Sequence, residues 1–198
     1  MGFQVEDLDS IMTDAPVMNE VNQRALRDAA VRMKPIRKAI GRAKTSAWSL
    51  GIFAAFSLII GIWSPSSLIP GAVLAAFTVQ EFRGVGMLQR LELRGPRHLA
   101  LNQVALAIAI VVYSVWHLWL SLHDGGPEAL ASLGDPGTEK MVRDMYRAVS
   151  VSLYATLAVV GPMFPLLTAW YYASRRKRID ALTMNTPQWA VDAIRDAA

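Results

Sequence analysis

Four polar side chains lie at the edges of long apolar stretches of this chain. Glu81 and Arg83 directly follow a run of 36 residues without Asp, Glu, Lys or Arg, and Asn102 and Gln103 lie near the start of the next such run. Polar groups at membrane depth are candidates for function, because placing them in lipid is costly. If the two runs form neighbouring antiparallel helices, these side chains form a hydrogen-bonded cluster at one depth. The pattern favours a polar tie, in which Glu81 pairs with an arginine and Asn102 joins two helices. The alternative is an inner constriction that takes an ion or a small ligand.

His117 is the one histidine well inside an apolar run, and it lies between Trp116 and Trp119. A single axial histidine is enough to hold a haem or a chlorophyll, so His117 is a candidate cofactor ligand. A histidine without a second ligand is more typical of a side chain that bonds to headgroups, water or backbone. We therefore expect no cofactor.

The motifs of common enzyme classes do not occur in this sequence. There is no cysteine to act as a nucleophile, no HExxH or Walker loop, and no GxSxG. The pair Gly84 and Gly86 lacks the third glycine and the preceding strand of a dinucleotide-binding loop. We expect a protein that is not an enzyme and that has no metal site.

The elements that position these residues follow from the segregation of charge. Apolar residues make up 53% of the chain and charged residues only 18%, with a mean hydropathy of +0.29. A helix needs about 20 apolar residues to cross a bilayer. We predict an all-α integral membrane protein, a four-transmembrane-helix bundle of two helical hairpins, with spans at about 43–63, 66–88, 98–122 and 146–174.

The first uncharged run must hold two of these spans, joined by a turn at 63–67. Pro65 and Pro70 suit a turn or the first turn of a helix. Each arm is short for a full span, so both helices extend past the charge boundary, where Lys and Arg reach the headgroups. The alternative is a re-entrant hairpin that dips into the membrane and returns.

The distribution of basic residues predicts the orientation. Residues 1–44, 81–98 and 175–198 hold 17 Lys and Arg, and the region between the last two spans holds 3. This bias places both termini in the cytoplasm, in a membrane that we expect to be a bacterial inner membrane. The net charge of +4 and pI of about 9.6 then indicate contact with anionic lipid. Nucleic-acid binding is not expected, because no recognition motif accompanies the basic residues.

The chain divides into three parts. Residues 1–44 form a cytoplasmic tail with an amphipathic interfacial helix that Pro35 kinks or interrupts. Residues 45–174 form the membrane domain, and residues 175–198 form a basic tail ending in a short helix. The outer loop, 123–145, holds a short helix and then the start of a helix that continues into the last span. Basic residues flanking the spans are expected to contact lipid headgroups: Arg37, Lys38, Arg42, Lys44, Arg175, Arg176, Lys177 and Arg178.

The last span contains Gly161, Pro162 and Pro165 near its middle. Proline kinks in membrane helices are common, and a structural kink is the interpretation favoured here. The alternative is a hinge or gate.

These features favour a structural or accessory membrane subunit, acting through helix packing and its cytoplasmic amphipathic helices. Small residues spaced by four, such as Gly51 with Ala55, allow close helix approach within the bundle or in a homo-oligomer or larger complex. One alternative is an oligomeric channel or small-solute transporter, with the kink at Pro162 and Pro165 as gate and the Glu81–Asn102 region as inner constriction. A second alternative is a haem- or pigment-bearing subunit that uses His117.

Overall fold

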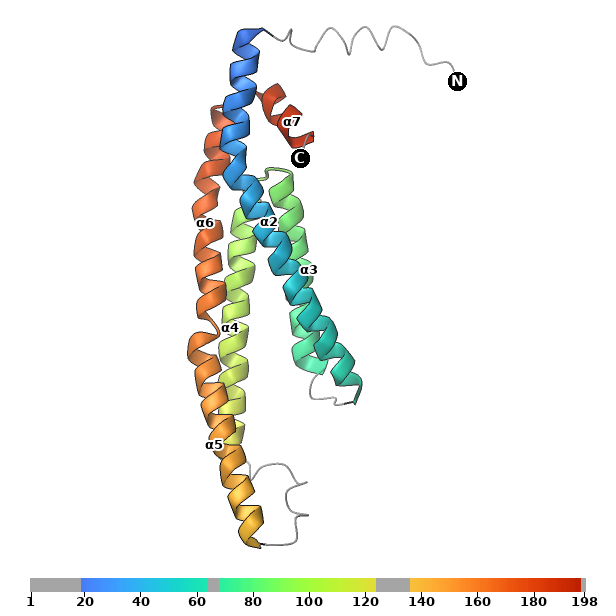
Figure 1. Ribbon diagram of the computed structural model, residues 1–198, viewed down its shortest axis with the longest axis vertical. Helices are drawn as coiled ribbons and strands as arrows, with labels where there is room; N and C mark the ends of the chain where they lie inside the picture. The colour runs from blue at the N-terminus through green and yellow to red at the C-terminus, as the bar shows by residue number, and fades with distance from the viewer. Residues whose placement is uncertain (1–18, 64–67, 124–135, 197–198) are drawn as a thin grey trace, which may run out of the picture.

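The computed structural model describes residues 19–63, 68–123 and 136–196, and the regular structure in these ranges is helical. This confirms the all-α prediction. In chain order the helices are α2 (Glu20–Trp63), α3 (Leu68–Gln89), α4 (Arg94–His123), α5 (Pro136–Val160), α6 (Met163–Met184) and α7 (Gln188–Asp196). Figure 1 shows α2 and α3 as one hairpin and α4 with the consecutive helices α5 and α6 as another. The C-terminal ends of α2 and α4 point toward the same end of the molecule.

Three helical segments are long and apolar enough to cross a membrane: Glu20–Trp63, Arg94–His123 and Gly137–Leu182. These candidate spans suggest a membrane location. The predicted span 66–88 corresponds to α3, which is helical as expected but carries Gln80, Glu81 and Arg83 and is not among the three. Over the described ranges there are thus three candidate spans, where the sequence predicts four.

The first hairpin is held by close contact between α2 and α3. A Cβ added at Gly71 would come within about 3.0 Å of the Leu58 side chain, and one at Gly51 would lie 3.3 Å from Thr78. Glycine at these positions lets the two backbones approach closely, which is what drives helix association in lipid. The helices end at Trp63 and begin again at Leu68, close to the predicted boundaries. The predicted turn between them, like the short helix expected in the outer loop, lies outside the described residues.

A tight turn after α3 sends the chain back as α4. Leu91 has a positive φ of 58°, and the Glu92 N–H donates to the Met87 carbonyl at 3.0 Å. This is a Schellman motif, in which glycine is the usual residue at the left-handed position. Leu91 occupies that position because its side chain is buried in the apolar cluster beneath the turn, which offsets the backbone strain.

Helix α2 is a single helix of 44 residues that passes through Pro35 without a break. Of the two outcomes predicted for Pro35, a kink or an interruption, the interruption does not occur. Met33 and Ile36, on either side of the proline, are buried, and this packing offsets the loss of one backbone hydrogen bond. Residue 44 is consequently not a helix boundary, and the N-terminal half of α2 packs on α6 and α7.

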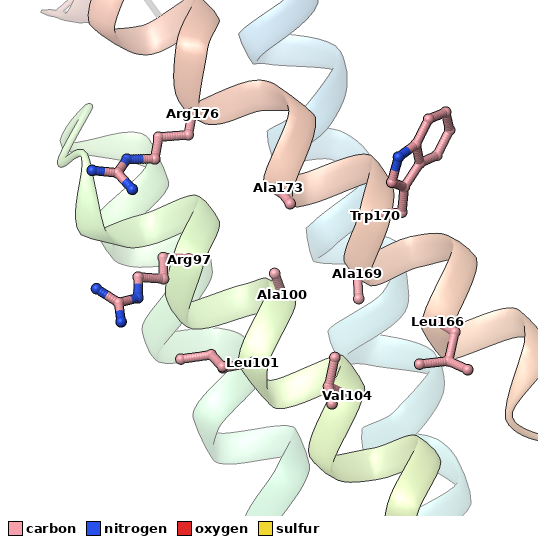
Figure 2. A pocket seen from close by; sticks show the side chains of 9 residues that line it. All are labelled: Arg97, Ala100, Leu101, Val104, Leu166, Ala169, Trp170, Ala173 and Arg176. Carbon is pink, nitrogen blue, oxygen red and sulfur yellow. The ribbon is translucent and has the colours of Figure 1, made fainter.

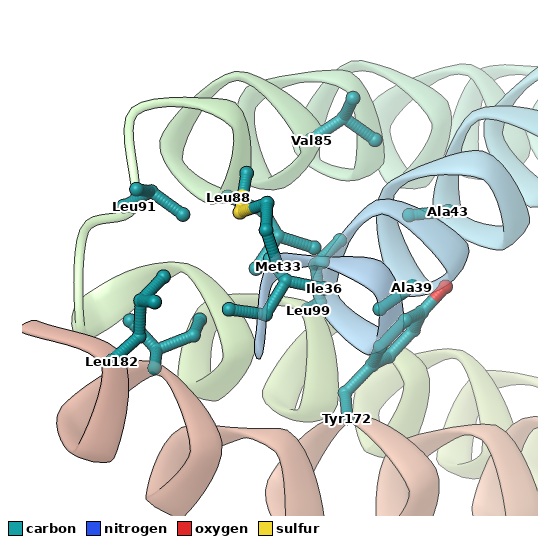
Figure 3. Close-up of a cluster of buried hydrophobic side chains, with 11 residues drawn as sticks. Met33, Ile36, Ala39, Ala43, Val85, Leu88, Leu91, Leu99, Tyr172 and Leu182 are labelled. Atoms are coloured by element: carbon teal, nitrogen blue, oxygen red, sulfur yellow. The ribbon is translucent and has the colours of Figure 1, made fainter. Parts of the chain in front are cut away.

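The main apolar cluster lies at the end of the molecule where α3 turns into α4. It joins side chains from α2, α3, α4 and α6, as Figure 3 shows: Met33, Ile36, Ala39, Ala43, Val85, Leu88, Leu91, Leu99, Tyr172, Ile179 and Leu182. Toward the other end the α2–α3 hairpin leans away from α4 and α5 (Figure 1). Large apolar side chains such as Phe53, Phe56 and Ile60 are exposed on this hairpin. The largest apolar cluster thus lies at one end, and the C-terminal half of α2 presents several large apolar side chains on its surface.

Candidate functional site

Glu81 of α3 is the most buried ionisable side chain in the described part of the chain, with an exposed fraction of 0%. The Asn102 Nδ2 donates to Glu81 Oε2 at 2.7 Å, and the Gln103 Nε2 donates to Glu81 Oε1 at 2.9 Å. Each carboxylate oxygen therefore accepts one amide hydrogen bond from α4. We call Glu81, Asn102, Gln103 and Ser46 the Glu81 cluster.

The two amides use their remaining hydrogens to reach other parts of the fold. Asn102 Nδ2 also donates to the Phe77 carbonyl at 3.2 Å, and Gln103 Nε2 donates to Ser46 Oγ at 3.4 Å. An amide nitrogen carries two hydrogens, so all four are engaged. The cluster consequently joins α2, α3 and α4 in one network of hydrogen bonds.

Arg83, predicted as the fourth member, lies outside the cluster. It follows Glu81 by two residues, which places it on another face of the helix, and its side chain is exposed. Ion pairs in the described ranges include Arg24–Glu20, Arg90–Glu92 and Arg143–Glu139, and none of these three includes Glu81. The expected partner of Glu81, an arginine, is thus replaced by two amides.

Ser46 is the member of the cluster that the sequence does not single out. Several serines lie in the apolar runs, and only the packing of α2 against the other two helices distinguishes this one. His98 adds a further link between α3 and α4, because its Nε2 lies 3.2 Å from the Gln80 carbonyl oxygen. No sequence signal marks either residue.

The hydrogen-bond donors that surround Glu81 determine which kind of chemical group the cluster can hold. Both amides present their N–H groups to the centre, and this suits an anionic group such as the Glu81 carboxylate. A cation would need oxygen ligands there instead. The described residues contain no group of three or more His, Cys, Asp or Glu that could hold a metal ion.

His117 packs among aromatic rings between α4 and α5. Its ring centroid lies 4.3 Å from that of Tyr113 and 4.9 Å from that of Tyr154 in a stacked arrangement. Tyr154 belongs to α5, so the stacked rings link α4 to α5. In this structure His117 therefore has a packing role.

The helical path between α5 and α6 breaks at Gly161 and Pro162, where the sequence predicts a kink or hinge. The Gly161 N–H still donates to the Leu157 carbonyl at 3.0 Å, while Pro165 is buried in the first turn of α6. A Cβ at Gly161 would lie 2.7 Å from Ile110 Cγ2 of α4. The break is thus packed tightly on α4, and its motion stays a prediction.

The basic residues predicted to contact headgroups lie on α2 and α6, near the end where α3 turns into α4. Arg42 and Arg175 lie against the ring of Tyr171, at 4.8 and 4.3 Å from its centroid. The other six are exposed: Arg37, Lys38, Lys44, Arg176, Lys177 and Arg178. Positive charge from two helices distant in sequence is thereby concentrated at one level.

Comparison of this chain with protein-family models, with curated proteins and with solved structures finds no match in any of the three.

Proposed function

We propose that this chain is a non-enzymatic membrane protein of four spans that serves as a structural or accessory subunit, either in a homo-oligomer or in a larger membrane complex. The observation that carries the proposal is the Glu81 cluster. A carboxylate with both oxygens held by amides of the adjacent helix is a tie between helices. This arrangement links helices and leaves no reactive group exposed, so it supports a structural role for the protein rather than a catalytic one.

The path of the first hairpin supports α3 as the fourth span. Helix α3 returns to the end from which the second half of α2 departs (Figure 1). Its 22 residues extend about 33 Å at 1.5 Å per residue, slightly more than the hydrocarbon thickness of about 30 Å. If α2 crosses the bilayer, α3 has the length to cross back.

The positions of the basic residues support an orientation with both ends in the cytoplasm. The cationic parts of α2, the turn after α3 and the C-terminal half of α6 lie at the same end of the molecule. The three basic residues of the other side, Lys140, Arg143 and Arg147, lie on α5 near the opposite end. This asymmetry is the positive-inside pattern.

Exposed apolar surface supports a role in lateral association. On α2 the exposed side chains include Ile52, Phe53 and Phe56, and on α5 they include Val149 and Leu153. Lipid covers such surfaces in a membrane, and so does a neighbouring subunit. A subunit that acts by packing needs these faces and no reactive group.

A second candidate, the translocation of ions or small solutes, is favoured by one observation. A groove of about 300 Å³ between α2 and α6 is lined by Arg42, Ser46, Thr168, Tyr171 and others. Ser46 belongs to this groove and also accepts the hydrogen bond from Gln103. The groove therefore reaches the edge of the Glu81 cluster, where an intramembrane carboxyl is a functional candidate.

Reconstituted protein distinguishes the two candidates. Liposomes of defined protein content are assayed for flux of protons, Na⁺, K⁺ and small neutral solutes. A structural subunit gives the same flux as protein-free liposomes. Flux that is well above this background, and that Glu81→Gln abolishes while the protein still inserts and elutes as a single species, contradicts the structural proposal.

A further inference from the structure

A second groove lies on the opposite side of α6, between α4 and α6 (Figure 2). Its volume is about 490 Å³, within the range typical of small-molecule sites. The floor consists of small side chains, Ala100 from α4 and Ala169 and Ala173 from α6, and Val104 and Leu166 continue it along the two helices. Two arginines, Arg97 and Arg176, stand at one end.

The spacing of these residues shows why the groove is continuous. On α4 the lining residues Arg97, Ala100 and Val104 recur every three or four positions, and on α6 Ala169, Ala173 and Arg176 do the same. Residues at this spacing form one face of a helix. Alanines where the helices face each other leave space that larger side chains would fill.

The arginines give the groove an amphipathic character. Arg97 lies one turn beyond Ala100, Arg176 lies one turn beyond Ala173, and their guanidinium groups extend toward the same side in Figure 2. Both side chains are exposed, and neither belongs to the ion pairs found in the described ranges. Two exposed guanidinium groups therefore stand at one end of an apolar groove.

We infer that this groove binds an anionic phospholipid of the inner leaflet, with the phosphate between Arg97 and Arg176 and an acyl chain along the alanine floor. Guanidinium groups bind phosphate oxygens in a bidentate manner. Basic pockets between membrane helices on the cytoplasmic side are suited to anionic headgroups. Trp170, which is 74% exposed beside the groove, is the residue type enriched at the membrane interface. A free phosphate ion has no apolar part to contact the alanine floor of the groove, whereas an acyl chain does.

The inference rests on the proposed membrane placement, because the two arginines must lie at the level of the inner headgroups. It adds to that proposal a specific lipid site, as distinct from general attraction between basic residues and an anionic surface. The membrane placement is tested independently by alkaline carbonate extraction of membranes that contain the full chain. Release into the soluble fraction contradicts the placement, whatever the groove binds.

Lipid binding is measured on the purified full chain in a neutral detergent. Phosphatidylglycerol is titrated, and phosphatidylcholine with the same acyl chains and inorganic phosphate serve as comparison probes. Binding is followed by native mass spectrometry and by the shift in thermal unfolding temperature. We expect saturable binding of phosphatidylglycerol at one site, at least tenfold tighter than phosphatidylcholine, and no shift with inorganic phosphate.

Two variants locate the site. Arg97→Gln combined with Arg176→Gln is expected to weaken phosphatidylglycerol binding at least tenfold. The matched control, Arg90→Gln with Arg94→Gln, removes two exposed positive charges near the turn from α3 to α4, outside the groove, and is expected to change binding less than twofold. Equal weakening in both double variants overturns the inference, because it shows attraction to general positive charge.

A third variant tests the apolar part without changing charge. Ala169→Phe places a large ring on the floor of the groove and is expected to weaken phosphatidylglycerol binding severalfold. The unfolding temperature of the lipid-free variant shows whether the fold is intact. Unchanged lipid binding in a well-folded Ala169→Phe protein contradicts the placement of an acyl chain in this groove.

Discussion

At the scale of single residues, Glu81 lies at the centre of the hydrogen bonds that link α2, α3 and α4. Its carboxylate accepts hydrogen bonds from Asn102 and Gln103, and Gln103 also donates to Ser46. A buried acceptor that is shared in this way is costly to remove, because each amide then keeps only one of its two hydrogen bonds and the other N–H is buried without an acceptor. The strength of the tie comes from this penalty.

Glu81→Ala is expected to lower the free energy of unfolding by about 3 kcal/mol, because two buried amides lose their acceptor. Glu81→Gln keeps the shape and one acceptor oxygen, and it is expected to cost about 1 kcal/mol. The measurement is equilibrium unfolding of the purified protein in mixed detergent, followed by circular dichroism.

The control for Glu81 is Arg83→Ala, on the same helix two residues away. Its side chain is exposed, and its replacement is expected to change stability by less than about 0.5 kcal/mol. A loss at Arg83 as large as that at Glu81 means that charge at this end of α3, and not the cluster, holds the helices.

At the scale of helices, the joint between α3 and α4 determines how the two hairpins meet. Gly95 lies in the first turn of α4, and a Cβ there would come within 2.9 Å of the backbone nitrogen of Leu88. Backbone atoms do not move aside as a flexible side chain does. The close approach of these helices therefore requires glycine at this position.

We expect Gly95→Ala to destabilise the protein by about 1–3 kcal/mol, the usual cost of overpacking. Gly86→Ala is the matched variant on α3, where a Cβ meets nothing within 4 Å. That change is expected to be neutral or to stabilise the helix by up to about 1 kcal/mol, since alanine is the better helix former. Thermal unfolding of the two variants beside the parent chain gives the comparison. Similar effects of the two substitutions would mean that the close contact at Gly95 contributes nothing.

The elements also show how far sequence reasoning extends. The ends of α2 at Trp63 and of α3 near Leu88 follow from charge and proline positions, and the structure agrees. Pro35 shows the limit, because its local propensity opposes a helix that tertiary burial of Met33 and Ile36 maintains. Local patterns carry no information about such burial.

The members of the Glu81 cluster can be predicted from the sequence to a similar degree. Polar residues flanking apolar runs identify Glu81, Asn102 and Gln103 as neighbours in depth, since antiparallel helices bring such positions level. The sequence does not reveal the direction of a side chain around the helix axis, and for that reason it also predicts Arg83 as a member of the cluster. Ser46 could not be found at all, because its role depends on the contact between α2 and α4.

At the scale of the whole molecule, the number of crossings is the property that the proposal most depends on. The chain contains no cysteine, so single introduced cysteines report on the side of the membrane without background labelling. Trp63 at the end of α2 is 88% exposed and tests whether the first hairpin reaches the outer surface.

With four spans, Trp63→Cys and Lys140→Cys react with a membrane-impermeant maleimide in intact cells. Arg90→Cys and Lys177→Cys react only after the cells are permeabilised. If the first hairpin is re-entrant, Trp63→Cys stays unlabelled while Lys140→Cys is labelled. If α3 does not cross, Arg90→Cys reacts from outside, and the four-span topology is wrong.

The continuity of α2 has a mechanical consequence. Its 44 residues form a rod of about 66 Å, and the apolar cluster around Ala39 and Ala43 holds it near the middle. A rigid helix that is held near its middle acts as a lever under a sideways force, and the apolar cluster is the point about which it pivots. If α2 pivots there as a rigid body, a displacement of its Glu20 end would swing its Trp63 end the opposite way, together with α3, which packs on it. A partner that binds the Glu20 end of α2 would in this way also move the α2–α3 hairpin.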